Sequence, residues 1–277
     1  MSRRASYALQ IPPFPRQAFP GLANVRATGA ATPRNETERR LTPLTVPIAG
    51  HADLEVATCS GAIEIIAEER DDLLIESAAS STSELELGDL GRVVIRPRRR
   101  GQAVVVRCPV GSDVSAATGS APIQLRGSFG RVRLSTRSGR IDVERVDHFT
   151  ARRSGTDPRR RGPRPGALST KSGAIRVDAA RAVETNTVSR TAELCCVQGR
   201  VRARSVSGAI RVEMTTNADL SAKSVSGRIH VTYPPGVRPS TRCRTLVGRT
   251  TIETDEGADC RCSVATVSGQ VTVASAV

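Results

Sequence analysis

The sequence predicts an all-β protein that folds as a β-solenoid or β-helix-like stack of short strands. Three observations predict this fold. Apolar and polar residues alternate in short stretches such as Leu54-Glu55-Val56, a Ser-Gly pair recurs along the chain, and the alternation changes phase at each pair. Alternation of this kind is typical of half-buried strands. No apolar period typical of a helix is sustained over about ten residues.

The Ser-Gly pairs mark an internal repeat. The glycines Gly208, Gly227, Gly248 and Gly269 are separated by 19, 21 and 21 residues. Self-similarity at a period of about 20 residues indicates a solenoid. The predicted corners are Gly61, Gly139, Gly173, Gly208, Gly227 and Gly269, with degenerate copies at Gly119, Gly130, Gly199 and Gly248.

The phase of the apolar positions predicts a bend at each pair. Before Gly208 the apolar residues are Val201 and Ala203, at odd offsets, and after it they are Ile210 and Val212, at even offsets. A straight strand keeps one parity for its inward side chains. The switch therefore predicts a unit of strand, Ser-Gly corner and strand, in which glycine gives backbone freedom and serine bonds the local backbone.

Composition and spacing divide the chain into two regions. Residues 1–42 are rich in Pro, Arg, Ala and Thr and predict a disordered or loosely packed leader. Residues 43–277 predict the β-strand-repeat domain, with an N-terminal strand cap over 43–100 and repeat coils over 101–277. The interval from Gly139 to Gly173 is 34 residues long, and its excess predicts an Arg/Pro-rich insertion loop over 150–166.

These motifs resemble a bacterial family usually labelled "putative adhesins", whose domain is a rack-like stack of β-strand repeats. The resemblance covers residues 44–277 and rests on Val110-Gly111-Ser112-Asp113-Val114, Thr118-Gly119-Ser120, Phe129-Gly130-Arg131-Val132 and the later Ser-Gly copies. It implies a right-handed β-solenoid-like fold, no known catalysis and occasional association with envelope-stress or surface systems. The family commonly has Asp after the corner, whereas this chain has Ala, Arg or Gln, which puts a cation-binding role in doubt.

The residue patterns indicate no active site, cofactor or metal. The three histidines, His51, His148 and His230, stand at unrelated repeat positions, and no phosphate loop, nucleophile elbow or His-Glu metal motif occurs. The acidic run around Arg70 is interpreted as a charge-rich turn. The seven cysteines lack paired Cys-x-x-Cys spacing, so they are interpreted as small core residues.

Net charge points to an anionic partner. The formal charge is +14 and the pI is about 10.9, and such a surface attracts anions. Almost all of the basic residues are Arg, a pattern that genome composition also produces. The candidate binding residues lie in the insertion: Arg152, Arg153, Arg159, Arg160, Arg161 and Arg164.

The sequence thus predicts a non-enzymatic binding or scaffold protein that engages an acidic protein or an anionic surface polymer. The alternative is a non-specific, Arg-mediated binder of nucleic acid or other anions; specific nucleic-acid binding is disfavoured because aromatic stacking residues are scarce. We expect no membrane span, since no stretch approaches the ~20 apolar residues that a span requires. We also expect a cytoplasmic location, since the apolar start is interrupted by prolines, and no disulfide framework, since the cysteine number is odd and that compartment is reducing. End-to-end dimerisation through open strand edges stays open.

Overall fold

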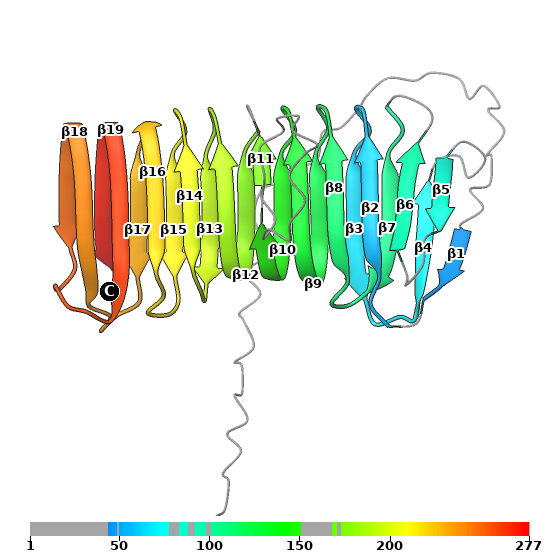
Figure 1. The fold of residues 1–277 in the computed structure, drawn as a ribbon, viewed down its shortest axis with the longest axis horizontal. Coiled ribbons are helices and arrows are strands. Elements are labelled where there is room, and N and C mark those ends of the chain that lie inside the picture. The colour runs from blue at the N-terminus through cyan, green and yellow to red at the C-terminus, as the bar shows by residue number, and fades with distance from the viewer. Residues whose placement is uncertain are drawn as a thin grey trace, which may run out of the picture. The chain divides into compact units, whose positions relative to one another are not determined.

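A computed structural model describes residues 44–48, 50–77, 83–87, 92–97, 101–150, 168–170 and 173–276. The chain divides into two units, Met1–Arg39 and Arg40–Val277, and every described residue belongs to the second. The described residues of this unit form 19 strands and include no helix. The predicted all-β class is confirmed. The leader predicted over 1–42 lies outside the described residues. Figure 1 shows the strands of the second unit side by side in one long row.

Segments that precede the corners form one ladder, which we call the first wall. Its strands are parallel except β5, which is antiparallel to β6. In spatial order the wall contains β5 (Ser83–Leu87), β6 (Arg92–Pro97), β2 (Asp53–Thr58), β8 (Asp113–Thr118), the later part of β9 (Ile123–Thr136), the later part of β10 (Ile141–Thr150) with β11 (Leu168–Thr170), the later part of β12 (Ile175–Thr187), β14 (Val201–Ser205), β16 (Leu220–Ser226), and the first parts of β19 (Cys260–Ser275) and β18 (Pro239–Glu253).

Segments that follow the corners form a second wall. Its strands also run in one direction, apart from β4, which is antiparallel to both of its neighbours, β1 and β7. In spatial order it contains β1 (Leu44–Pro47), β4 (Asp72–Ser77), β7 (Val104–Pro109), β3 (Ile63–Glu68), the first parts of β9, β10 and β12, then β13 (Ala192–Val197), β15 (Ile210–Met214), β17 (Ile229–Tyr233), and the ends of β19 and β18.

The core lies between the two walls, where each inward position repeats along the stack. Residues such as Leu54, Val132 and Val201 of the first wall share one hydrophobic cluster with residues of the second wall. The clearest column consists of in-register isoleucines, each at most 1% exposed, with Ala192 standing between the fourth and the fifth: Ile63, Ile123, Ile141, Ile175, Ile210 and Ile229. Stacked β-branched side chains bury their apolar area against the equivalent residue of the next strand, so a thin core needs few aromatics.

The corner glycines permit close contact between neighbouring turns of the chain. Gly61, Gly139, Gly173, Gly208 and Gly227 lie between strands, whereas Gly269 lies within β19. A Cβ on Gly208 would lie 1.9 Å from the carbonyl oxygen of Arg190, and one on Gly139 would lie 1.8 Å from that of Ala121. Neither glycine has a positive φ. Glycine is therefore required here by space and not by an unusual backbone angle.

A column of hydroxyl side chains supports the corners from inside the first wall. The residue three positions before the glycine supplies it: Thr136 Oγ1 accepts a hydrogen bond from the Gly139 amide at 2.9 Å, and Ser205 Oγ accepts one from the Gly208 amide at 2.9 Å. The serine beside the glycine acts across the stack instead, because Ser207 Oγ donates to the carbonyl of Val188 at 3.0 Å. The sequence predicts a local backbone hydrogen bond for the serine beside the glycine. The hydroxyl three residues before the glycine makes that bond instead.

The order of strands in space departs from the order in sequence at both ends. Leu220 and Thr241 both pair with Cys262, so β19 lies between β16 and β18, and β18 forms the end of the wall. Leu54 pairs with both Val93 and Val114, so β2 lies between β6 and β8. Residues 43–100 therefore contribute the antiparallel strands β1, β4 and β5 at one end and also β2 and β3, which lie inside the stack.

The 150–166 insertion interrupts a strand of the first wall. Apart from Thr150 it falls outside the described residues. β10 ends at Thr150 and β11 begins at Leu168, and both strands pair with β9 and with β12. The chain thus leaves the first wall and returns to the same place in it.

Candidate anion-binding face

Four neighbouring strands of the first wall, β14, β16, β19 and β18, carry a concentration of basic side chains on their outer surface. Alternate residues of a strand point outward, and neighbouring strands lie about 4.8 Å apart, so equivalent positions form rows across the wall. We call this surface the basic face. It consists of the residues eight, six and four positions before each corner glycine. They are Arg200, Arg202 and Arg204 before Gly208; Asp219, Ser221 and Lys223 before Gly227; Arg261, Ser263 and Ala265 before Gly269; and Ser240, Arg242 and Arg244 before Gly248.

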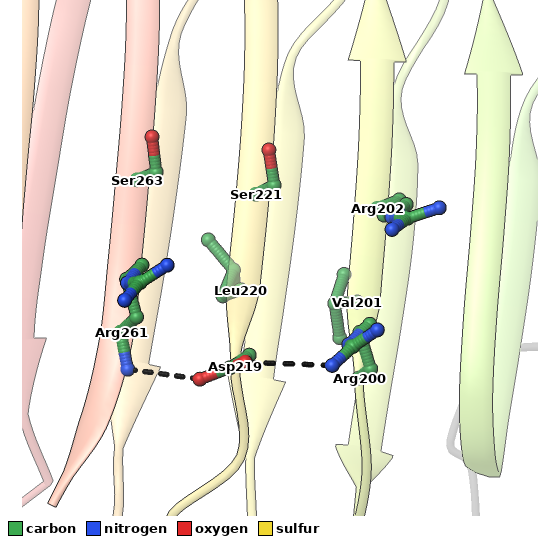
Figure 2. Close-up of a pocket in the computed structure, with 8 residues that line it drawn as sticks. All are labelled: Arg200, Val201, Arg202, Asp219, Leu220, Ser221, Arg261 and Ser263. Atoms are coloured by element: carbon green, nitrogen blue, oxygen red, sulfur yellow. Dashed lines mark hydrogen bonds and ion pairs between the residues drawn. The ribbon is translucent and has the colours of Figure 1, made fainter.

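A shallow open depression of about 370 Å³ lies in the basic face (Figure 2). Its outward lining residues come from three strands, and the small side chains of Ser221 and Ser263 leave space between the longer arginines. Asp219 lies in the same depression: its Oδ1 accepts a hydrogen bond from the Arg261 amide at 3.0 Å, and its Oδ2 is 3.7 Å from Nη2 of Arg200. Hydroxyl and guanidinium donors thus surround a single carboxylate.

The remaining cations of the basic face have no carboxylate partner among the described residues. All are exposed, and no ion pair joins them to an acidic side chain there: Arg202, Arg204, Lys223, Arg242 and Arg244. A guanidinium offers a planar set of donors that matches carboxylate, sulfate or phosphate oxygens. A row of such groups on a rigid wall can therefore hold several anionic groups of one molecule at once.

On the second wall, three outer arginines stand beside acids. Nε of Arg126 is 3.3 Å from Glu64, Nε of Arg176 is 3.0 Å from Asp178, and Nη1 of Arg211 is 3.9 Å from Glu193. The hydrogen bond to Asp178 raises the pKa of Arg176. Positive charge at these three positions is locally compensated, so this part of the second wall differs from the basic face in the charge that it offers to a partner.

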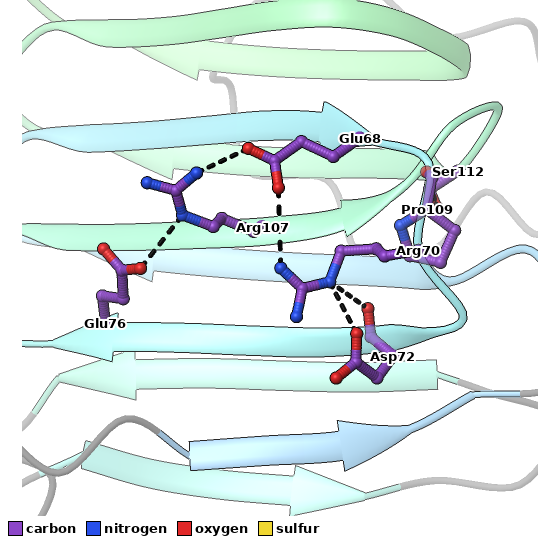
Figure 3. Close-up of polar contacts among 7 residues, drawn as sticks. All are labelled: Glu68, Arg70, Asp72, Glu76, Arg107, Pro109 and Ser112. Carbon is purple, nitrogen blue, oxygen red and sulfur yellow. Dashed lines mark hydrogen bonds and ion pairs between the residues drawn. The ribbon is translucent and has the colours of Figure 1, made fainter.

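Acidic residues near β3 and β4 are also compensated (Figure 3). Arg107 contacts Glu68 at 2.5 Å and Glu76 at 3.0 Å, and Nε of Arg70 contacts Asp72 at 2.6 Å. The hydrogen bond from Arg70 lowers the pKa of Asp72. The carboxylate of Asp72 is thus held as the ionised partner of an arginine, the opposite of the raised pKa expected of a general acid.

Histidine and cysteine do not converge on a site. His51 lies before β2 and His230 lies in β17, and within the described ranges no group of three His, Cys, Asp or Glu residues could hold a metal ion. The seven cysteines are free thiols. Burial raises the pKa of Cys108 to about 11 and that of Cys262 to about 12, so these two thiols stay protonated near neutral pH.

The sequence-based candidates and the observed basic face are different residues. The six insertion arginines, from Arg152 to Arg164, lie outside the described residues. The basic face was missed because its arginines are spread singly over four strands. The phase change at each corner could have identified them. Residues an even number of positions before each glycine point outward, and these residues include Arg202, Arg204, Arg242 and Arg244.

Comparison with known proteins decides the family. A family model described as Toastrack DUF4097 matches residues 35–274, most of the chain. The protein belongs to the Toastrack DUF4097 family. The resemblance to a bacterial family of strand-repeat domains is thereby confirmed, and the paired walls are this chain's version of the Toastrack domain. No curated protein matches the sequence.

Solved structures that match this chain carry adhesion and lipid-binding names. A putative adhesin from Bacteroides fragilis is 9% identical, with a TM-score of 0.40 over 85% of this chain and 97% of that chain. A putative lipid binding protein from Parabacteroides distasonis is 14% identical, with a TM-score of 0.39 over 83% of this chain and 96% of that chain. In this Toastrack protein no helix of the described residues is long and apolar enough to cross a membrane.

Proposed function

We propose that this Toastrack protein is a non-enzymatic scaffold, a β-solenoid of about 20-residue coils, whose basic face binds an acidic protein or an anionic polymer. The observation that carries the proposal is the set of exposed cations on β14, β16, β19 and β18 that lack carboxylate partners in the described chain. Unpaired surface charge of one sign attracts a partner of the opposite sign. The rigid strand spacing turns these cations into a regular array.

The regular array favours a partner with many anionic groups. Rows of the basic face cross four strands, so the cations span about 14 Å along the stack at the usual strand spacing. Each contact with a soluble single anion is weak because solvent and salt screen exposed charges. Several contacts with one molecule act together, so a polymer or an acidic protein surface gains most from this arrangement.

The position of the insertion supports the same partner class. Its two attachment points, Thr150 and Leu168, lie in the first wall, and β12 alone separates that rung from β14. The arginines of residues 150–166 are thus tethered to the wall that carries the basic face. Their contribution to binding is part of the proposal.

Nucleic acid is the alternative polyanion. The basic face supplies cations for phosphates, but none of its twelve outward positions is aromatic, and single-strand binders stack bases on aromatic side chains. Binding of nucleic acid would therefore be non-specific and governed by backbone charge.

The test compares two charge variants of equal size. One replaces cations of the basic face (R202Q/R204Q/K223Q), and the control replaces paired cations elsewhere (R126Q/R140Q/R211Q), which contact Glu64, Asp142 and Glu193. Binding of polyglutamate, heparin and single-stranded DNA is measured by titration at low salt. We expect the first variant to bind about tenfold more weakly and the control to change by less than about twofold. Equal losses in both variants would show that net charge alone governs binding.

Location and assembly are part of the same proposal. We propose a cytoplasmic scaffold, in keeping with its free thiols. β18 pairs with β19 on one side and has no second strand partner among the described residues, so two copies can join end to end through this edge. Analytical ultracentrifugation over a concentration series tests the dimer, and a monomer at every concentration would rule it out.

A further inference from the structure

Exposed aliphatic side chains follow one edge of the stack, beside the basic face. Val206, Val225 and Val267 are 45%, 48% and 45% exposed, and Leu246 is 80% exposed. Each lies two residues before a corner glycine. Neighbouring residues pair in register across β14, β16, β19 and β18, so the four side chains form one line across adjacent strands. We call this line the apolar ridge.

The apolar ridge is a local feature and not a general property of the corners. Its side chains point outward because they share the phase of the basic face. The equivalent position of earlier corners is Cys59 before Gly61 and Arg137 before Gly139. Aligned exposed aliphatic residues on a soluble surface commonly mark an interaction site.

Cations flank the ridge on both sides. On the basic-face side, Arg204, Lys223 and Arg244 lie two residues away along their strands, about 7 Å. On the other side, Arg228 and Arg249 directly follow the corner glycines and are exposed. None of these five has an ion pair within the described ranges. A partner of this edge must therefore present an apolar zone bordered by negative charge.

We propose that this edge docks on an anionic phospholipid membrane surface. The aliphatic side chains of the ridge enter the boundary between headgroups and acyl chains, and the flanking guanidinium and ammonium groups contact lipid phosphates. The ridge is a protruding line along the corners, and such an edge matches a broad, deformable surface. A bilayer offers apolar area with phosphates above it at every point, which is the charge pattern that the edge requires.

The two components of the edge respond differently to salt. Attraction of Lys and Arg to an anionic surface is screened by salt, whereas burial of aliphatic side chains depends on their apolar area and is insensitive to salt. Neither component alone gives stable attachment. Docking should therefore require both the ridge and negatively charged lipid.

Vesicle co-sedimentation tests this proposal on the full chain. The ridge variant V206S/V225S/L246S/V267S keeps every charge, and V110S, which replaces a valine 41% exposed at a distant turn, is the matched control. Vesicles contain phosphatidylcholine with phosphatidylglycerol, or phosphatidylcholine alone. We expect the unchanged protein to pellet only with the anionic vesicles, V110S to behave in the same way, and the ridge variant to partition at least about tenfold less.

Binding of polyglutamate to the same variants separates this inference from the proposed function. The ridge variant should bind polyglutamate as the unchanged protein does, which also shows that it is folded. Equal vesicle binding by the ridge variant and the unchanged protein would overturn membrane docking. Failure of the unchanged protein to pellet with anionic vesicles would overturn it too, and would leave the polymer result unaffected.

Discussion

The corner glycines show how one residue type is selected by its neighbour in the stack. At Gly208 the Cβ position is 1.9 Å from a backbone carbonyl oxygen of the adjacent turn of the chain, and at Gly227 it is 2.3 Å from the carbonyl oxygen of Gly208. Backbone cannot rotate away as a flexible side chain does. Any larger residue at these positions must therefore push two turns of the chain apart.

Alanine at a corner should cost more stability than alanine at an ordinary turn glycine. We expect G208A to lower the free energy of unfolding by about 3 kcal/mol, because the added methyl group overlaps backbone. The control is G236A, where φ is +82° and no atom lies within 4 Å of the Cβ position; its left-handed backbone should cost about 1 kcal/mol. Urea unfolding measures both. Equal losses would mean that close approach is not what selects glycine.

The hydroxyl column gives a second comparison between equivalent residues. Ser205 and Ser224 occupy the same position and are similarly buried, but Ser205 Oγ accepts the Gly208 amide whereas Ser224 Oγ has no hydrogen-bond partner among the described residues. We expect S205A to destabilise by about 1 kcal/mol and S224A to be neutral or slightly stabilising. Thermal unfolding of the two variants checks this. The reverse order would contradict the role of the hydroxyl.

At this scale the sequence predicts much of the pattern and misses its cause. The phase change around Gly208 identifies which side chains are buried, as Val201, Ala203, Ile210 and Val212 show. The sequence shows the spacing between the turns that carry Arg190 and Gly208. It does not show that the Cβ position of Gly208 points at the carbonyl oxygen of Arg190. Glycine is compatible both with unusual φ angles and with close approach, so composition cannot distinguish the two.

Strand order is the main feature of the elements that sequence could not supply. Every inward position of a wall carries a similar aliphatic or small residue, so Cys262 fits beside Leu220 as well as beside Thr241. Packing of the inward residues therefore does not determine which turn of the chain stacks on which. The repeat spacing gives no information on the placement of β19 inside the wall and of β18 at its end.

Hydrogen exchange should reveal this order. β19 pairs on both sides, with β16 and β18 in the first wall, whereas β18 pairs with β19 alone among the described strands. We expect amides of residues 260–275 to exchange much more slowly than those of 239–253, because edge strands open without the rest of the wall. Mass spectrometry of peptic fragments measures this. Faster exchange in the later segment would indicate stacking in sequence order.

The whole molecule combines a uniform fold with an uneven charge distribution. Ladders of equivalent residues build both walls, and the walls differ at these outward positions: Arg202 and Arg244 make no ion pair with an acid of the described chain, whereas Arg126 and Arg211 are ion-paired with Glu64 and Glu193. The net charge of +14 predicts an anionic partner. It could not predict the face, because that depends on which strands become neighbours.

The salt dependence of polyphosphate binding tests the central claim, that the basic face is where anions bind. The affinity is measured over a series of salt concentrations for the unchanged protein, for R202Q/R204Q/K223Q and for R126Q/R140Q/R211Q. Each lost phosphate contact lowers the slope of log affinity against log salt by about 0.7 to 0.9. We expect a clearly shallower slope for the basic-face variant R202Q/R204Q/K223Q and an unchanged slope for the control. Identical slopes for the two variants would contradict it.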